Sequence, residues 1–194
     1  MQNIENKEQI EKQINIGQHT GGIYVSKQSK FSRLFNRLSE EATNKDIYND
    51  TLDELKRYIT DKDGYGLERK LQDGGFTESE IIKALDRKQM YWMKMEKNIL
   101  YLSAQRIYTE LLAKIIIDFE THIEPLIKKG ETKDLIVIEI LDKVVNPIFT
   151  LLNDDGADDN VLYFNMEEIF GMIYYLTGRC HLNWTDYDSV SPSI

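Results

Sequence analysis

The sequence predicts a mainly α-helical protein: a helical bundle around one long central helix, with an N-terminal β-hairpin. The central helix is predicted by residues 103–129, whose apolar side chains fall on one broad arc at about 100° per residue. That arc covers about half of the circumference, which is more than one neighbouring helix can cover. Shorter segments with apolar residues at helical spacing lie on both sides of it, and strand-like alternation occurs only near the N-terminus.

The hairpin is predicted at residues 13–26. Apolar residues alternate with polar ones on both sides of a glycine-bearing break, and they are Ile14, Ile16, Ile23 and Val25. An isolated hairpin is marginally stable in water. It must therefore either pack on its own helices or pair with strands of another chain, which would make a homo-oligomer. We divide the chain into an N-terminal tail and hairpin (1–27), a helical domain (28–188) and a flexible tail (189–194).

The first helices follow from apolar spacing and from start and stop signals. We expect helices at about 28–41 and 52–61, and a short helical turn at Leu67–Leu71 that ends at Gly74 and Gly75. Thr77 and Glu80 form a capping box that starts a helix running to about Asn98. Trp92, Met90 and Met95 widen the apolar surface of that helix; core filling is the favoured interpretation of this cluster, and an adaptable partner-binding face is the alternative.

The second half of the chain continues the pattern. Pro125 should bend or weaken the last turns of the central helix. Another helix is expected at 132–152, interrupted at Asn146-Pro147, followed by a solvated acidic loop at 153–160. The last helix should start at an Asn165 cap with Glu168 behind it and stop at Gly178, while Gly171 inside it lets a neighbouring backbone approach closely.

Composition and charge restrict the class of protein. No apolar run approaches the roughly 20 residues needed to span a bilayer, and the polar first twenty residues show no signal peptide. With Cys180 as the single cysteine, we expect a cytoplasmic protein without an internal disulfide and without membrane contact. The net charge of −9 is concentrated after residue 150. Direct nucleic-acid binding is therefore disfavoured, and protein partners are expected.

No motif for catalysis, metal binding or cofactor binding is found. The sequence lacks a phosphate-binding loop, a GxSxG elbow, an HExxH pair and a CxxC pair. Residues 61–66 superficially resemble a calcium loop, but Tyr65 and Gln72 stand where oxygen ligands are required. We therefore assign no catalytic residue, no metal ligand and no cofactor.

Cys180, His181 and His122 are the residues on which an alternative function, a small hydrolase or nuclease, would depend. Neighbouring residues on an extended segment point to opposite sides, so Cys180 and His181 do not readily pair. The favoured interpretation is a small buried thiol beside a histidine that hydrogen-bonds a backbone carbonyl. For His122, we expect a buried hydrogen bond to Asp118, one turn earlier on the central helix. A further alternative is a regulatory helical domain that binds a small ligand between helices.

The last helix and its exit, IFGMIYYLTGRCHLNW at residues 169–184, carry a family resemblance. So do SAQRI at 103–107, LLAKI at 111–115, HIEPLI at 122–127, and GLERKL at 66–71 with the two glycines that follow. Over about residues 50–184 the chain resembles a C-terminal domain family of the bacterial ABC-three-component conflict systems.

The resemblance implies a role rather than a reaction. In these predicted anti-phage systems an ABC- or SMC-like ATPase works with a middle component and an effector, and the C-terminal domain is thought to couple them. The domain usually follows an effector domain, whereas here only a tail and the hairpin precede residue 28, so we expect a non-enzymatic adaptor. The candidate interface or signature residues are the four apolar hairpin residues named above together with Gly171, Tyr174, Tyr175, Thr177, Gly178, Arg179, Cys180, His181 and Trp184.

Overall fold

The computed structural model describes residues 28–60 and 65–187, and these form a mainly helical fold without a strand. The elements are α1 (Lys30–Asn44), α2 (Asp53–Ile59), α3 (Leu67–Asp73), α4 (Glu78–Asn98), α5 (Leu102–Asp118), η1 (Phe119–Ile123), α6 (Glu124–Lys128), α7 (Lys133–Ile140), η2 (Leu141–Val145), α8 (Asn146–Asp155) and α9 (Met166–Gly178). The mainly α-helical prediction is thereby confirmed. The predicted hairpin at 13–26 and the tail at 189–194 lie outside the described residues.

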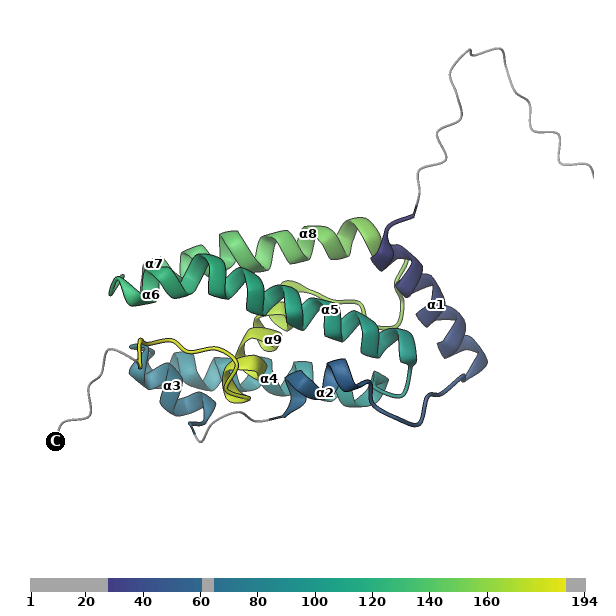
Figure 1. The fold of residues 1–194 in the computed structure, drawn as a ribbon, viewed down its shortest axis with the longest axis horizontal. Coiled ribbons are helices and arrows are strands. Elements are labelled where there is room, and N and C mark those ends of the chain that lie inside the picture. The colour runs from purple at the N-terminus through teal and green to yellow at the C-terminus, as the bar shows by residue number, and fades with distance from the viewer. Residues whose placement is uncertain (1–27, 61–64, 188–194) are drawn as a thin grey trace, which may run out of the picture.

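The predicted central helix is present. α5 continues through the π-helical turn η1 into α6, so that residues 102–128 form one long helical segment. Figure 1 shows this segment running the length of the molecule beside α7 and α8, with α4 and α9 on its other side and α1 across one end. α5 contacts α1, α2, α4 and α9. Its core-facing side chains are fully buried, among them Ile107, Tyr108, Leu111, Leu112 and Ile115.

Both π-helical turns precede a proline. η1 comes directly before the segment that contains Pro125, and η2 comes directly before the segment that contains Pro147. Proline has no N–H to donate, and its ring clashes with the carbonyl four residues earlier. The wider turn places an extra residue there and lets the helix continue. The weakening expected at Pro125 and the interruption expected at Asn146-Pro147 therefore correspond to π-helical turns, and the helix continues through both.

The turn at η1 corrects the expectation for His122. One extra residue in a turn rotates the following side chains by about 100° relative to a regular α-helix. His122 is consequently exposed, although regular spacing would place it on the apolar arc. Asp118 forms an ion pair with Lys114 at 2.9 Å between Oδ2 and Nζ. The predicted buried bond between His122 and Asp118 is wrong.

Gln105 is a buried polar residue on the core side of α5, with only 1% of its surface exposed. Its side-chain oxygen accepts a hydrogen bond from the backbone N–H of Leu52 at 2.7 Å. Its amide nitrogen donates to the carbonyls of Asp50 and Ile99, each at 2.7 Å. Because all three partners are backbone groups in connections between helices, Gln105 fixes the start of α2 and the turn after α4 against α5.

α4 and α9 pack against each other along an extensive contact. Gly171 lies where a Cβ atom would stand 2.5 Å from the carbonyl oxygen of Arg87 and 2.8 Å from Cβ of Tyr91. The close backbone approach predicted at Gly171 is thereby confirmed. Arg87 also forms a two-point ion pair with Glu167, with N–O distances of 2.5 and 3.0 Å, and Lys94 pairs with Glu168.

Candidate functional site: the exit of α9 and the groove between α1 and α5

The last helix begins and ends with local signals in the sequence. Asn165 and Glu168 form a capping box, each side chain accepting from the other residue's backbone N–H at 3.0 Å, as predicted. The helix ends at Gly178, but the residue in the left-handed conformation is Cys180, with φ +65°. The N–H groups of Cys180 and His181 donate back to Thr177 and Leu176 at 3.0 and 2.9 Å, which is a Schellman arrangement. Gly178 is therefore helical and does not supply the left-handed turn.

After this turn the chain folds back and buries Trp184. The indole Nε1 donates to Oγ1 of Thr177 at 3.0 Å. The ring packs edge-on against Phe76, with 4.8 Å between centroids, and lies near Phe119 and Tyr174 at about 6 Å. Gly74 permits this position, because a Cβ there would stand 2.7 Å from Cβ of Trp184. The segment thus joins α9 to the end of α3 and to the central helix.

The predicted signature residues fall into two groups in the structure. Gly171, Tyr174, Tyr175, Thr177 and Trp184 are buried within this chain. Gly178, Arg179, Cys180 and His181 are partly exposed, and the guanidinium of Arg179 lies over the rings of Trp92 and Tyr175. The buried group has a structural role in the fold, while an interface role stays a prediction. The hairpin residues Ile14, Ile16, Ile23 and Val25 lie outside the described residues.

The three residues considered for catalysis have different surroundings. The thiol of Cys180 is partly exposed, where a buried thiol was expected, and it contacts the carbonyl oxygen of Tyr65 at 3.1 Å. The ring of His181 lies 5.9 Å from that of Tyr58, and His122 is exposed on η1. Within residues 28–60 and 65–187, no group of three or more histidine, cysteine or acidic residues is arranged to hold a metal ion.

The Met-aromatic cluster of α4 is divided between core and surface. Met95 is buried, as core filling predicts, and Trp92 stacks on Tyr175 at 5.6 Å between centroids. Met90 and Met93 are 47% and 60% exposed. These two side chains leave an apolar, adaptable surface on the outer side of α4.

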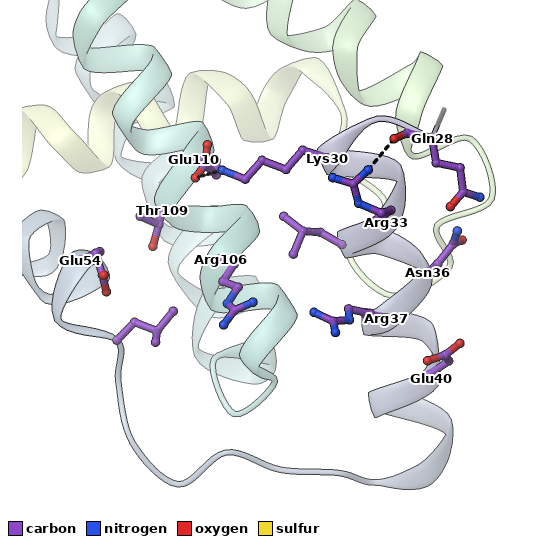
Figure 2. Close-up of a pocket in the computed structure, with 12 residues that line it drawn as sticks. Gln28, Lys30, Arg33, Asn36, Arg37, Glu40, Glu54, Arg106, Thr109 and Glu110 are labelled. Atoms are coloured by element: carbon purple, nitrogen blue, oxygen red, sulfur yellow. Dashed lines mark hydrogen bonds and ion pairs between the residues drawn. The ribbon is translucent and has the colours of Figure 1, made fainter. Parts of the chain in front are cut away.

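A groove of about 850 Å³ lies between α1, the start of α2 and α5. Figure 2 shows Arg37 on α1 and Arg106 on α5 pointing into it from opposite sides, while Lys30 reaches across one end to Glu110. The groove is lined by four basic residues, Lys30, Arg33, Arg37 and Arg106, by three acidic residues, Glu40, Glu54 and Glu110, and by Gln28, Leu34, Asn36, Leu52 and Thr109.

Two of the basic residues are unpaired within the described part of the chain, although Glu40, Glu41 and Asp46 line an adjoining pocket together with both of them. Lys30 is paired with Glu110 at 2.5 Å, and Arg33 donates to the carbonyl of Gln28 at 2.7 Å. Neither Arg37 nor Arg106 makes a side-chain hydrogen bond or ion pair with another described residue, and both are exposed. The lining holds four basic and three acidic residues, so the groove carries only a small net positive charge in a chain whose net charge is −9.

Sequence reasoning missed the groove. Its walls come from segments about 70 residues apart, and no local motif joins them. The one signal in the sequence is the spacing of Arg33 and Arg37, which places both on one side of α1. The polar side of the central helix, which carries Arg106, looked like an ordinary solvated surface.

The fold and the site define a mainly helical module in which the fold-back at Trp184 joins α9 to α3 and to the central helix. Residues 66–184 match the family model described as C-terminal domain 9 of the ABC-three component (ABC-3C) systems. The match covers more than half of the chain, and the protein belongs to this family. A search of the curated proteins and of the solved structures found no match. Among the described helices, none combines the length and apolar character needed to cross a membrane.

Proposed function

We propose that this protein is a non-enzymatic assembly component of a bacterial anti-phage ABC-three-component system. In this role it couples an effector to the ATPase by protein–protein contacts in the cytoplasm. The observation that carries the proposal is the family match over residues 66–184. A component of such a system works beside other proteins, so surfaces that recognise proteins are the features of interest.

Two surface features support protein recognition. The first is the groove with its two arginines that are unpaired among the described residues, because arginine is enriched where proteins recognise each other. The second is exposed apolar surface, which occurs in two places. Met90 and Met93 form one of them on α4. The other lies on and just after α7, at Leu135, Ile138 and Leu141, which are 36%, 60% and 38% exposed. Contiguous exposed apolar side chains of this kind are common in protein-binding surfaces.

The test is co-purification from cells that express the affinity-tagged protein together with the products of its neighbouring genes. We expect an ATPase and an effector to elute with the tagged chain in fixed ratios after size-exclusion chromatography. A matched control uses the same tag on a chain with Trp184→Ala, which should lose the fold-back and with it the partners. If the wild-type chain elutes alone in the presence of these gene products, the proposal is wrong.

The predicted hairpin adds a separate proposal about self-association. We propose that strands at residues 13–26 join two copies of the chain through Ile14, Ile16, Ile23 and Val25. Light scattering should give the mass of a dimer for the full chain and of a monomer for residues 28–194. A monomeric full chain at tens of micromolar would contradict this proposal and leave the family role intact.

A further inference from the structure

We infer that the groove between α1 and α5 binds an acidic peptide segment of a partner protein, with Arg37 and Arg106 holding its carboxylates. The inference rests on the proposed function, because it names the chemistry of the partner that the assembly component recognises. Three observations carry it. Two arginines in the groove are unpaired among the described residues, and the groove lining has a small net positive charge in a chain of net charge −9. Most of the groove also lies outside the residues that match the family model.

The two arginines are placed for carboxylates that come from outside. They extend from different helices into the same space (Figure 2), so a bound segment would lie between them and contact both. Guanidinium groups bind carboxylates through two parallel hydrogen bonds, which are among the stronger polar contacts in proteins. Each arginine is free of described side-chain partners, so binding would not require an existing ion pair to break.

The groove favours a peptide over a nucleic acid. Glu40, Glu54 and Glu110 line it together with the basic residues. A phosphate backbone carries a negative charge at every nucleotide, so it would place charges beside these carboxylates. A peptide can space its acidic side chains to meet the arginines and leave neutral residues beside the glutamates. Leu52, which is half-buried in the lining, offers contact for an apolar side chain of that peptide.

Most of the groove lies outside the part of the chain that matches the family model. All lining residues except Arg106, Thr109 and Glu110 precede residue 66, where the family match begins. The helices α1 and α2 therefore add a binding surface to one side of the shared domain.

The probe is a fluorescein-labelled peptide of sequence Gly-Glu-Leu-Glu-Glu-Leu-Glu-Gly, and its control is the same peptide with every glutamate replaced by glutamine. Fluorescence anisotropy with the full chain should show saturable binding of the acidic peptide that weakens as salt is raised, and at least tenfold weaker binding of the glutamine peptide. The double variant Arg37→Glu and Arg106→Glu should bind the acidic peptide at least tenfold more weakly than the wild type.

The matched control is the double variant Lys83→Glu and Lys97→Glu, which makes the same change in net charge on exposed positions of α4, outside the groove. It should bind within about twofold of the wild type. Three results would overturn the inference. One is that the wild type fails to bind the acidic peptide, and another is that both double variants lose binding equally. The third is tighter binding of a single-stranded DNA oligonucleotide than of the acidic peptide at the groove.

The co-purification assay separates this inference from the proposed function. If the neighbouring gene products elute with the wild-type chain and equally with the arginine double variant, the groove does not bind the partner and the assembly role stands. If they do not elute with the wild type, the proposed function fails whatever the peptide result. If the gene products elute with the wild type and are lost only from the arginine double variant, the result supports both the proposed function and the inference about the groove.

Discussion

Substitution of Gly171 by alanine tests whether the α4–α9 contact is limited by backbone atoms. The new Cβ would stand 2.5 Å from the carbonyl oxygen of Arg87, a backbone atom that cannot rotate away. One helix must then move, at a cost of about 1–3 kcal/mol for overpacking, and for a backbone contact this short we take the upper end. Alanine gains about 1 kcal/mol in helix propensity over glycine. We therefore expect a net loss of about 1–2 kcal/mol of unfolding free energy.

Gly178→Ala is the matched control, because it makes the same change in the same helix. Its Cβ would meet the side-chain nitrogen of Lys88 at 2.9 Å, and this flexible end can move away. The propensity gain then remains, and this variant should be as stable as the wild type or more stable. The two variants should differ by about 1–3 kcal/mol in urea unfolding, or about 2–12 °C in melting temperature. Agreement within about 0.5 kcal/mol would refute the reasoning.

Three further predictions concern single contacts. Thr177→Val should lower the unfolding free energy by about 1–3 kcal/mol in urea unfolding, because Nε1 of Trp184 loses its acceptor while buried. The same substitution should cost little in a Trp184→Phe background. An unchanged cost there would show that the hydrogen bond is not its source. Cys180→Gly should stabilise the protein by about 0.5–1 kcal/mol, because glycine adopts positive φ without strain, whereas Cys180→Ala should not; equal stability of the two variants would argue against strain at this turn. The ion pair with Lys133, together with hydrogen bonds from Thr77, lowers the pKa of Glu80 to about 2 from an ordinary value of 4.5. The stabilisation that the ionised Glu80 side chain provides should therefore be complete above pH 4.5 and lost as the pH falls to 2. The melting temperature of the wild type minus that of Glu80→Gln should therefore decrease from pH 5 to pH 2, and a constant difference would contradict the lowered pKa.

The capping boxes show which parts of the fold could be predicted from the sequence. Thr77 with Glu80, and Asn165 with Glu168, each place both partners within four residues, so the sequence alone fixes where α4 and α9 begin. The apolar arc of the central helix was equally readable, because helical periodicity follows from the geometry of one segment. The close approach at Gly171 could be predicted as well, although the sequence did not say which helix would come near.

His122 and Cys180 show where local reasoning failed. Regular spacing placed His122 on the apolar arc, but the π-helical turn before Pro125 rotates it outward, and a change of helix type is not encoded in periodicity. Gly178 looked like the residue that ends α9, yet the left-handed position is Cys180. There the fold-back that buries Trp184 sets the chain direction, and this contact spans α3, α9 and the central helix.

The sequence by itself determined the helical class, the central helix, the starts of the capped helices and the family resemblance, because each depends on residues close together in the chain. Only the tertiary structure decided the groove between α1 and α5 and the facing positions of Arg37 and Arg106. The physical reason is that a groove is a relation between helices distant in sequence. Its charge and shape exist only after the core has packed and fixed the direction in which each helix turns its polar side.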